Sequence, residues 1–267
     1  MKITINGKEQ ETACQTAFQV RDSIRSPDDI VILNGFQIAQ DAPLSEADNL
    51  SIIRKSVMPN QDELESMMMA RHTPNVHHKV KGAKVGIAGL GGLGSNIAVM
   101  LARIGVGHLL LVDFDIVEPS NLNRQSYYVR HLGMPKVTAL KEQIQEINPF
   151  IKIDTVLVKI TEENVVELFE DCDIICEAFD KADQKSMLIN SALSKLPESI
   201  IVSGSGMAGY DSSNTIKTRR PMKRLYLCGD LENEAQVGKG LMAPRVQICA
   251  GHQANMILRL LVGEEEV

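Results

Sequence analysis

The first part of the chain alternates polar and apolar residues in short runs. Residues 2–5 alternate strictly, Asn6-Gly7 is a two-residue turn signal, and residues 8–12 return as a second strand. A helix capped by Thr16 should follow, with Ala17, Val20 and Ile24 on its buried face. Further strands are predicted at residues 30–33, 36–38 and 50–53. This order of elements within sixty residues predicts a β-grasp domain over residues 1–57.

Residues 58–83 have the pattern of a helical connector. Asn60 is suited to cap a helix, with Glu63 at the capping-box position and Leu64, Met67 and Met68 on an apolar face. Three of the six histidines fall in this connector. Their spacing fits no usual zinc pattern, so no metal site is expected here.

The pattern changes in residues 85–113. An apolar run at 85–88 leads into Gly89, Gly91 and Gly94, and the next residues place Leu93, Ile97, Leu101 and Ile104 on one helical face. A second apolar run at 109–112 ends on Asp113. This is the pattern of a nucleotide-binding β-α-β unit. Gly89 permits a tight turn, Gly91 lets backbone N–H groups approach phosphate, and Gly94 lets the helix pack closely on the strand.

Strands and helices continue to alternate after this unit. Helices are predicted at 136–147, from a cap at Thr161 through Phe169, at 184–195, and from Pro244 to a stop at Gly263. Strands are predicted at 151–158, 173–178, 200–203, 215–218 and 225–228. Residues 84–267 are therefore expected to form an α/β, Rossmann-like domain with a mostly parallel sheet.

Composition narrows the functional classes. The chain has 267 residues, 44% of them hydrophobic, with a net charge of −6. No apolar leader or membrane-spanning run is evident, so a cytoplasmic protein without a membrane partner is expected. The acidic balance and the lack of a basic patch give no reason to expect nucleic acid. Five scattered cysteines do not form a disulfide framework.

Two interpretations of the glycine unit compete. In a dehydrogenase Asp113 would bind the ribose hydroxyls of NAD. The sequence after the second apolar run instead continues as Asp113-Phe114-Asp115 and then Ser120-Asn121-Leu122-Asn123-Arg124-Gln125. An arginine fork suits a triphosphate better than a nicotinamide. ATP is therefore the favoured nucleotide.

These motifs, GxGGLGS, LVDxDxVxxSNLxRQ and Gly133-Met134-Pro135-Lys136, closely resemble those of the ThiF/MoeB/HesA family, relatives of the ubiquitin-activating enzymes. The resemblance implies ATP-dependent adenylation of the C-terminal glycine of a small ubiquitin-like sulfur carrier, ThiS of thiamin thiazole biosynthesis. It implies catalytic roles for Arg71, Arg124, Lys136 and Asp180. It implies nucleotide contacts from Gly89, Gly91, Gly92, Gly94, Asp113, Asp115, Ser120, Asn121, Arg124 and Lys136.

The resemblance also implies Mg²⁺ and a homodimer. Asp180 matches the aspartate that holds Mg²⁺, although Lys181 replaces the usual asparagine after it. Asp183 is an alternative carboxylate, expected instead to cap a helix. Arg71 lies about where the family has an arginine that reaches into the partner subunit's ATP site; the alternative is a solvated arginine at the end of a helix.

Other features depart from some relatives. The chain has no C-x-x-C pair, so zinc is not expected. Residues 234–238, where some relatives carry a reactive cysteine, contain none, which predicts adenylation without an enzyme thioester. Cys249 is expected to be a small buried residue.

Several alternatives stay open. The first domain resembles ThiS but continues from Ile53 into Met58-Pro59 instead of ending in Gly-Gly, so it is either a carrier mimic or a stabilising appendage. The substrate could be the molybdopterin synthase carrier. The protein could also be a nucleotide-binding scaffold or sensor whose own first domain occupies the site. A basic cluster, Arg219, Arg220, Lys223 and Arg224, is either a solvated face or a surface for an acidic carrier.

Overall fold

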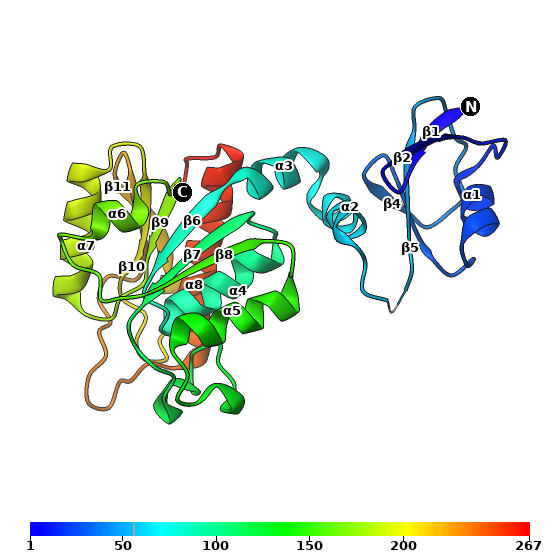
Figure 1. The fold of residues 1–267 in the computed structure, drawn as a ribbon. Coiled ribbons are helices and arrows are strands. Elements are labelled where there is room, and N and C mark those ends of the chain that lie inside the picture. Colours follow the sequence, from blue (N-terminus) through cyan, green and yellow to red (C-terminus); the bar gives the residue numbers. More distant parts are fainter. Residues whose placement is uncertain (56) are drawn as a thin grey trace. The chain divides into compact units, whose positions relative to one another are not determined.

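The chain divides into two compact units, Met1–Lys79 and Val80–Val267, each with its own sheet (Figure 1). The computed structural model describes residues 1–55 and 57–267.

The first unit is a five-stranded sheet with one helix on its main core face. Its strands are ordered β2-β1-β5-β3-β4, with β1 and β5 parallel and the other pairs antiparallel. Both Asn-Gly pairs have positive φ, as a two-residue hairpin turn requires. The predicted β-grasp order is confirmed. The elements are β1 (Lys2–Ile5), β2 (Lys8–Glu11), α1 (Ala17–Ile24), β3 (Ile30–Leu33), β4 (Phe36–Ile38) and β5 (Asn49–Ile53).

Both faces of the central strand β5 are buried. On one face Leu50 and Ile52 join the core under α1. On the other face α2 (Gln61–His72) packs against β3, β4 and β5, and the hydroxyl of Ser51 donates to that of Ser66 at 3.0 Å. The predicted Asn60 capping box of α2 is confirmed. The prediction that Ile24 is buried is wrong: it is 49% exposed, because only the earlier turns of α1 cover the core.

The second unit is a seven-stranded sheet of order β11-β12-β10-β9-β6-β7-β8, parallel except for β11. Helix α3 (Pro74–Gly82) leads into it. Its strands are β6 (Lys84–Ala88), β7 (His108–Asp113), β8 (Lys152–Leu157), β9 (Ile174–Glu177), β10 (Ile200–Gly204), β11 (Lys217–Met222) and β12 (Leu225–Gly229). Its helices are α4 (Gly92–Arg103), α5 (Lys136–Ile147), α6 (Val165–Phe169), α7 (Ala182–Lys195) and α8 (Ala243–Val262), with 3₁₀ turns η1 (Pro119–Asn121), η2 (Val129–His131) and η3 (Ser213–Thr215). The α/β class and the mostly parallel sheet are confirmed.

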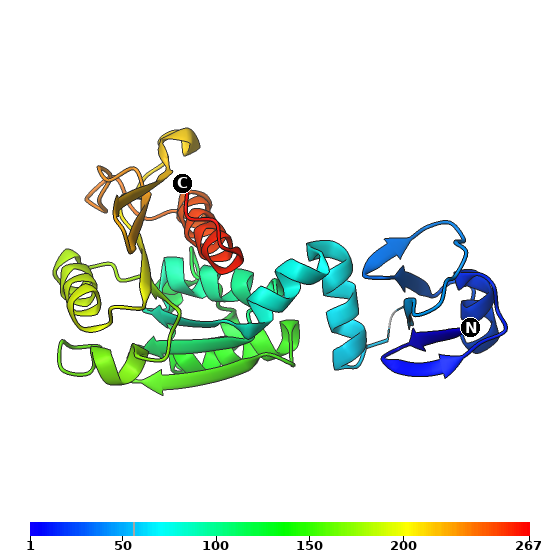
Figure 2. The ribbon, with the colours of Figure 1, turned by 90° about the horizontal axis from the view of Figure 1, so that it is seen from above.

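Helices cover both faces of this sheet (Figure 2). Helix α4 packs against α5 and α8, whereas α6 packs against α7 around a core that contains Phe169, Leu188 and Ala192. The chain runs outward from β6 to β8 and then returns to β9 on the other side of β6. This reversal of strand order is where open α/β sheets bind their ligands, at the carboxyl ends of the strands.

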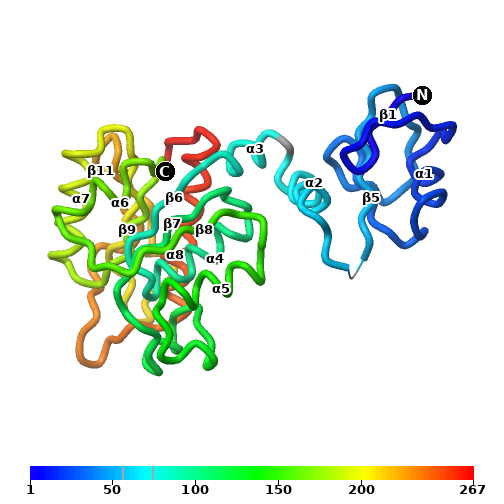
Figure 3. Tube along the Cα trace, in the orientation of Figure 1, coloured from blue at the N-terminus to red at the C-terminus, as the bar shows by residue number. Residues whose placement is uncertain are grey.

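Two long connections leave the sheet at that same end. They join β7 to α5, drawn green in Figure 3, and β12 to α8, drawn orange.

The predicted Thr161 cap is wrong, because Asn164 is the N-cap residue of α6 and its side chain instead accepts from the Thr161 N–H at 2.8 Å. Within the described ranges, no helix has the length and apolar character to cross a membrane.

Candidate active site

The glycine loop closes tightly between β6 and α4. Gly89 has a φ of 89° and its N–H donates to the Val112 carbonyl at 2.9 Å, which joins the loop to β7. A Cβ on Gly94 would lie 1.9 Å from the Gly89 carbonyl oxygen, so only glycine fits there. The Ser95 hydroxyl donates to the Gly91 carbonyl at 2.6 Å. The loop thus directs the N-terminus of α4, with its unpaired N–H groups, toward a ligand at this edge.

Carboxylates follow the end of β7. Asp113 is buried; its Oδ2 accepts from the Leu90 N–H at 2.6 Å and its Oδ1 from the Asp115 N–H at 2.8 Å. Asp115 is paired with the buried Lys136, whose Nζ lies 3.0 Å from Oδ2. Lys136, which lies 21 positions after Asp115 in the sequence, therefore meets the two carboxylates at the end of β7 beside the glycine loop.

Tyr127 supports the same loop and was missed by the sequence analysis. Its hydroxyl donates to the Leu90 carbonyl at 2.9 Å. Burial, and then the charges of Asp113 and Asp115, raise the pKa of Tyr127 well above its ordinary value. The hydroxyl therefore stays protonated and remains a donor.

Arg124 lies over the loop, whereas Asn121 faces its own turn. The Arg124 Cγ lies 3.5 Å from the position of a Cβ on Gly92, and its Nη1 donates to the carbonyl of Ser120 at 3.2 Å. Its Nε is buried and has no hydrogen-bond partner among the described residues. The buried Asn121 accepts from the Glu118 N–H at 3.0 Å through its side-chain oxygen. Arg124 thus lies against the glycine loop and has one unpaired donor, its buried Nε.

The end of β9 meets the end of β6 at Gly89. A Cβ there would lie 2.9 Å from the Phe179 ring and 3.1 Å from the Ala178 carbonyl oxygen. Asp180 follows directly, is exposed, and forms no side-chain hydrogen bond or ion pair with any described residue. The prediction that Asp183 caps α7 is wrong, because Lys181 is the N-cap residue and Asp183 lies within the first turn.

A single free carboxylate matches the way Mg²⁺ binds in phosphate-transfer sites. Mg²⁺ there takes one or two carboxylates and completes its shell with substrate phosphates and water. Over residues 1–55 and 57–267, no group of three or more His, Cys, Asp or Glu side chains is placed to hold a metal by itself. Asp180 beside the glycine loop fits Mg²⁺ that arrives with a nucleotide.

Arg71 belongs to the first unit. Its guanidinium is exposed and donates to the side-chain oxygen of Gln37 in β4 at 3.2 Å. The structure therefore gives Arg71 a contact within its own unit, and it is the one predicted catalytic residue outside the second unit.

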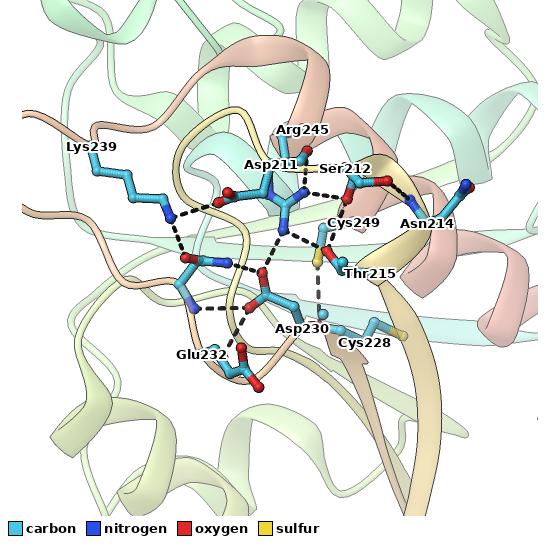
Figure 4. A network of polar contacts seen from close by, with 12 residues as sticks. Asp211, Ser212, Asn214, Thr215, Cys228, Asp230, Glu232, Lys239, Arg245 and Cys249 are labelled. Atoms are coloured by element: carbon cyan, nitrogen blue, oxygen red, sulfur yellow. Dashed lines mark hydrogen bonds and ion pairs between the residues drawn. The ribbon is translucent and has the colours of Figure 1, made fainter.

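A buried ion pair that no sequence pattern indicates joins the loops at the carboxyl edge of the sheet (Figure 4). Arg245, in the first turn of α8, is paired with Asp230 at the end of β12, and both side chains are 4% exposed. Arg245 also donates to the carbonyls of Asp211 and Ser212 at 2.7 and 2.8 Å. The adjacent Val246 lies 3.0 Å from the position of a Cβ on Gly92. This network thus supports the glycine loop from the side of α8.

Hydrogen bonds lower the pKa of Asp230. Burial alone would raise it, but donors from Asn233, Glu232 and Arg245 outweigh burial and bring the pKa to about 2. Asp230 is therefore a permanent anion opposite Arg245 at neutral pH.

The basic cluster has internal partners. Arg224 donates to the carbonyls of Leu193, Leu196 and Ser199 at 2.7–2.8 Å, so it caps the end of α7. Arg220 donates to the Lys223 carbonyl and to Glu265. Cys249 is fully buried as predicted, and burial raises the pKa of its thiol to about 12.

Comparison with known proteins identifies the family. The ThiF family matches residues 64–267, and the ThiS-like ubiquitin family matches residues 1–56. The chain is 35% identical over 196 residues to the molybdopterin-synthase adenylyltransferase of Haemophilus influenzae, covering 70% of this chain and 78% of that protein. It is 32% identical over 202 residues to the sulfur carrier protein ThiS adenylyltransferase of Bacillus subtilis, covering 72% of this chain and 58% of that protein.

Solved structures agree on the fold. The ATP complex of the Escherichia coli tRNA N6-threonylcarbamoyladenosine dehydratase has a TM-score of 0.68 at 20% identity, covering 77% of this chain and 96% of that chain. With the motifs, the sheet order and both family matches in agreement, this chain belongs to the ThiF family and carries a ThiS-like ubiquitin domain at its N-terminus.

Proposed function

We propose that this protein transfers AMP from ATP to the C-terminal carboxylate of a ubiquitin-like sulfur carrier. One observation carries the proposal: the glycine loop after β6 packs, at Gly89, against the turn after β9 that leads to the unpaired Asp180. A phosphate loop and a free carboxylate then face the same nucleotide. The Haemophilus and Bacillus relatives support it, since both are adenylyltransferases.

Each neighbouring side chain has a role in this proposal. Backbone N–H groups of the glycine loop bind phosphate oxygens at the N-terminus of α4. Asp113 accepts from the ribose hydroxyls with the lone pairs that its two backbone donors leave free. Arg124 offers its guanidinium group to the phosphates, and Lys136 exchanges Asp115 for a phosphate oxygen. Asn121 and Ser120 border the same segment.

The reaction makes one bond and breaks one. An oxygen of the carrier carboxylate forms a bond to the α-phosphorus of ATP, the bond to the bridging β-phosphate oxygen breaks, and pyrophosphate leaves. The protein's contribution is alignment of the two reactants and neutralisation of charge by Arg124, Lys136 and the loop N–H groups. Asp180 would hold Mg²⁺, which would supply further neutralisation of charge on the leaving pyrophosphate.

We further propose ThiS as the carrier. The ThiS-like domain at residues 1–56 and the Bacillus relative support this choice, and the Haemophilus relative makes the molybdopterin synthase carrier the rival. We also propose that the protein acts as a dimer in which Arg71 reaches the partner subunit's ATP site, as the family resemblance implies.

The test is exchange of labelled pyrophosphate into ATP with Mg²⁺, run with each carrier ending in Gly-Gly. Exchange with ThiS alone supports the whole proposal. Exchange with the molybdopterin carrier alone would identify that carrier as the substrate and would still support adenylation as the reaction. ATP binding without exchange for either carrier contradicts adenylation and favours a nucleotide-binding scaffold.

A further inference from the structure

A fully buried carboxylate ends strand β9. Glu177 is 0% exposed, and its Oε1 accepts from the Phe179 N–H at 2.7 Å while its Oε2 accepts from the Ser203 hydroxyl at 2.5 Å. The Lys185 ammonium lies 3.0 Å from both oxygens. Gln253 donates to the Glu177 carbonyl at 3.0 Å. Four elements, β9, β10, α7 and α8, thus meet at this one residue.

A buried ion pair such as this one is weak evidence for a stabilising role. Removing two charges from water costs several kcal/mol, and well-packed apolar residues of similar volume often replace a buried pair without loss. Lys185 is only 17% exposed in its side chain, so both partners are largely desolvated. A role in fixing the position of neighbouring residues therefore explains the pair better than a role in stability.

The pair spans the segment that carries Asp180. On one side, the Phe179 N–H bond to Glu177 closes a turn directly after β9. On the other side, Lys185 lies in the first turns of α7, which begins two residues after Asp180. The backbone before and after Asp180 is thus fixed by the same carboxylate, whereas the Asp180 side chain has no described partner.

The segment is also in contact with the glycine loop. The Ala178 N–H donates to the Ala88 carbonyl at 2.9 Å, and the Phe179 ring fills the space where a Cβ on Gly89 would lie. A shift of this turn would therefore move Asp180 relative to the loop. Metal sites respond strongly to such supporting contacts.

We propose that the Glu177–Lys185 pair positions Asp180 for the Mg²⁺ that accompanies ATP. Glu177 is a positioning residue and touches no reactant. This inference rests on the proposed function, because that function makes Asp180 the Mg²⁺ ligand.

The test substitutes Glu177→Gln in the full chain. Glutamine keeps the size of the side chain but turns one acceptor into a donor that faces existing donors. ATP binding is measured by calorimetry over a range of Mg²⁺ concentrations and in EDTA, alongside pyrophosphate exchange. We expect the Mg²⁺ concentration for half-maximal ATP binding to rise about tenfold, with the affinity for metal-free ATP unchanged and exchange restored at high Mg²⁺.

A second variant and a control complete the design. The double variant Glu177→Gln/Lys185→Met removes both charges and serves if the single variant does not fold; the same shift in Mg²⁺ dependence is expected. Lys195→Met removes the lysine of an ion pair at the far end of the same helix, with Glu162 at 3.3 Å, and should leave the Mg²⁺ dependence unchanged.

Two outcomes overturn the inference. In the first, the variant loses exchange equally at every Mg²⁺ concentration while the half-maximal value stays at the wild-type level. In the second, ATP binding by the wild-type chain does not respond to Mg²⁺. A wild-type chain that binds Mg²⁺ and ATP together but exchanges no pyrophosphate contradicts the proposed function instead, and the binding comparison still decides the role of Glu177.

Discussion

The Asp113 carboxylate accepts a 2.6 Å hydrogen bond from the Leu90 N–H, which joins the end of β7 to the glycine loop after β6. Its second oxygen accepts from the Asp115 N–H. The residue proposed to bind ribose is therefore also the one that fixes the phosphate loop. The ribose and the phosphates of the nucleotide would therefore contact one rigid set of residues.

Asp113→Asn should for this reason damage both stability and binding. The amide has one acceptor and one donor, so one of the two backbone N–H groups must face an NH₂ group. We expect a loss of about 1–3 kcal/mol in the free energy of unfolding, measured by urea denaturation, and weaker ATP binding. Equal stability and affinity for the two proteins would contradict the double role.

Gly94→Ala tests the close approach within the loop. The new Cβ would lie 1.9 Å from the Gly89 carbonyl oxygen, and backbone must move to admit it. Thermal denaturation should show a loss of about 1–3 kcal/mol, and ATP binding should fall. Gly251→Ala on α8 is the matched control, because nothing lies within 4 Å of its Cβ position; it should gain about 1 kcal/mol from helix propensity.

Asp180→Ala should remove activity without unfolding the protein. The side chain is exposed and unpartnered among the described residues, so the melting temperature should stay within the error of the measurement. Pyrophosphate exchange should fall by at least about 100-fold, the usual effect of removing a group that stabilises charge in the transition state. Asp183→Ala, three residues on and also exposed, should retain exchange. The reverse result would make Asp183 the metal ligand.

Mixing two inactive variants tests whether Arg71 acts on a partner. In the proposed dimer, Arg71→Ala and Asp180→Ala would each remove a different subunit's contribution to a site, so a mixed dimer would contain one intact site. After subunit exchange, an equimolar mixture should recover roughly a quarter of wild-type activity. Variants that remain inactive when mixed, in a protein that light scattering shows to be dimeric, would place Arg71 outside the partner's site.

The Asp230–Arg245 pair predicts a pH-dependent loss of stability. The pKa of Asp230 falls from its ordinary value of 3.8 in the unfolded chain to about 2 in the folded protein. A lowered folded-state pKa stabilises the protein above the unfolded value, and that contribution disappears as the pH falls from about 4 toward 2. Asp230→Asn should be destabilised by about 3–5 kcal/mol at pH 6, because it leaves Arg245 buried without a counter-charge. The difference from wild type should narrow at pH 3.

Asp211→Asn provides the comparison for that experiment. Asp211 is paired with Lys239 at 2.6 Å in the same network but is 43% exposed in its side chain. An exposed pair contributes less than about 1 kcal/mol. A loss as large as that of Asp230→Asn would show that exposure does not separate the two pairs.

Short local patterns in the sequence predicted most of the fold correctly. The Asn60 and Glu63 capping box, the two Asn-Gly hairpins and the strand-glycine-helix unit after Val85 are all contained within a few residues, and the structure has each of them. Apart from Ile24 at the end of α1, the errors fell on polar residues near helix starts. Thr161 and Asp183 both had suitable side chains, yet Asn164 and Lys181 hold the cap positions.

Long-range polar contacts could not be predicted. Glu177, Lys185 and Ser203 meet because three elements converge, and no sequence spacing reports that convergence. Arg245 was part of a correctly expected helix, but its partner Asp230 lies at the end of a strand fifteen residues earlier. A lone buried charge has no sequence signature until its partner is known.

The position of β6 between β7 and β9 has a consequence for how the site forms during synthesis. Gly89 and Asp180 are about ninety residues apart in the chain, and they meet only when β9 pairs with the far edge of β6. A nascent chain that has already made the whole glycine motif thus still lacks the second half of the site. Nucleotide binding that needs both halves of the proposed site would consequently report the pairing of β9 with β6 rather than the presence of the motif.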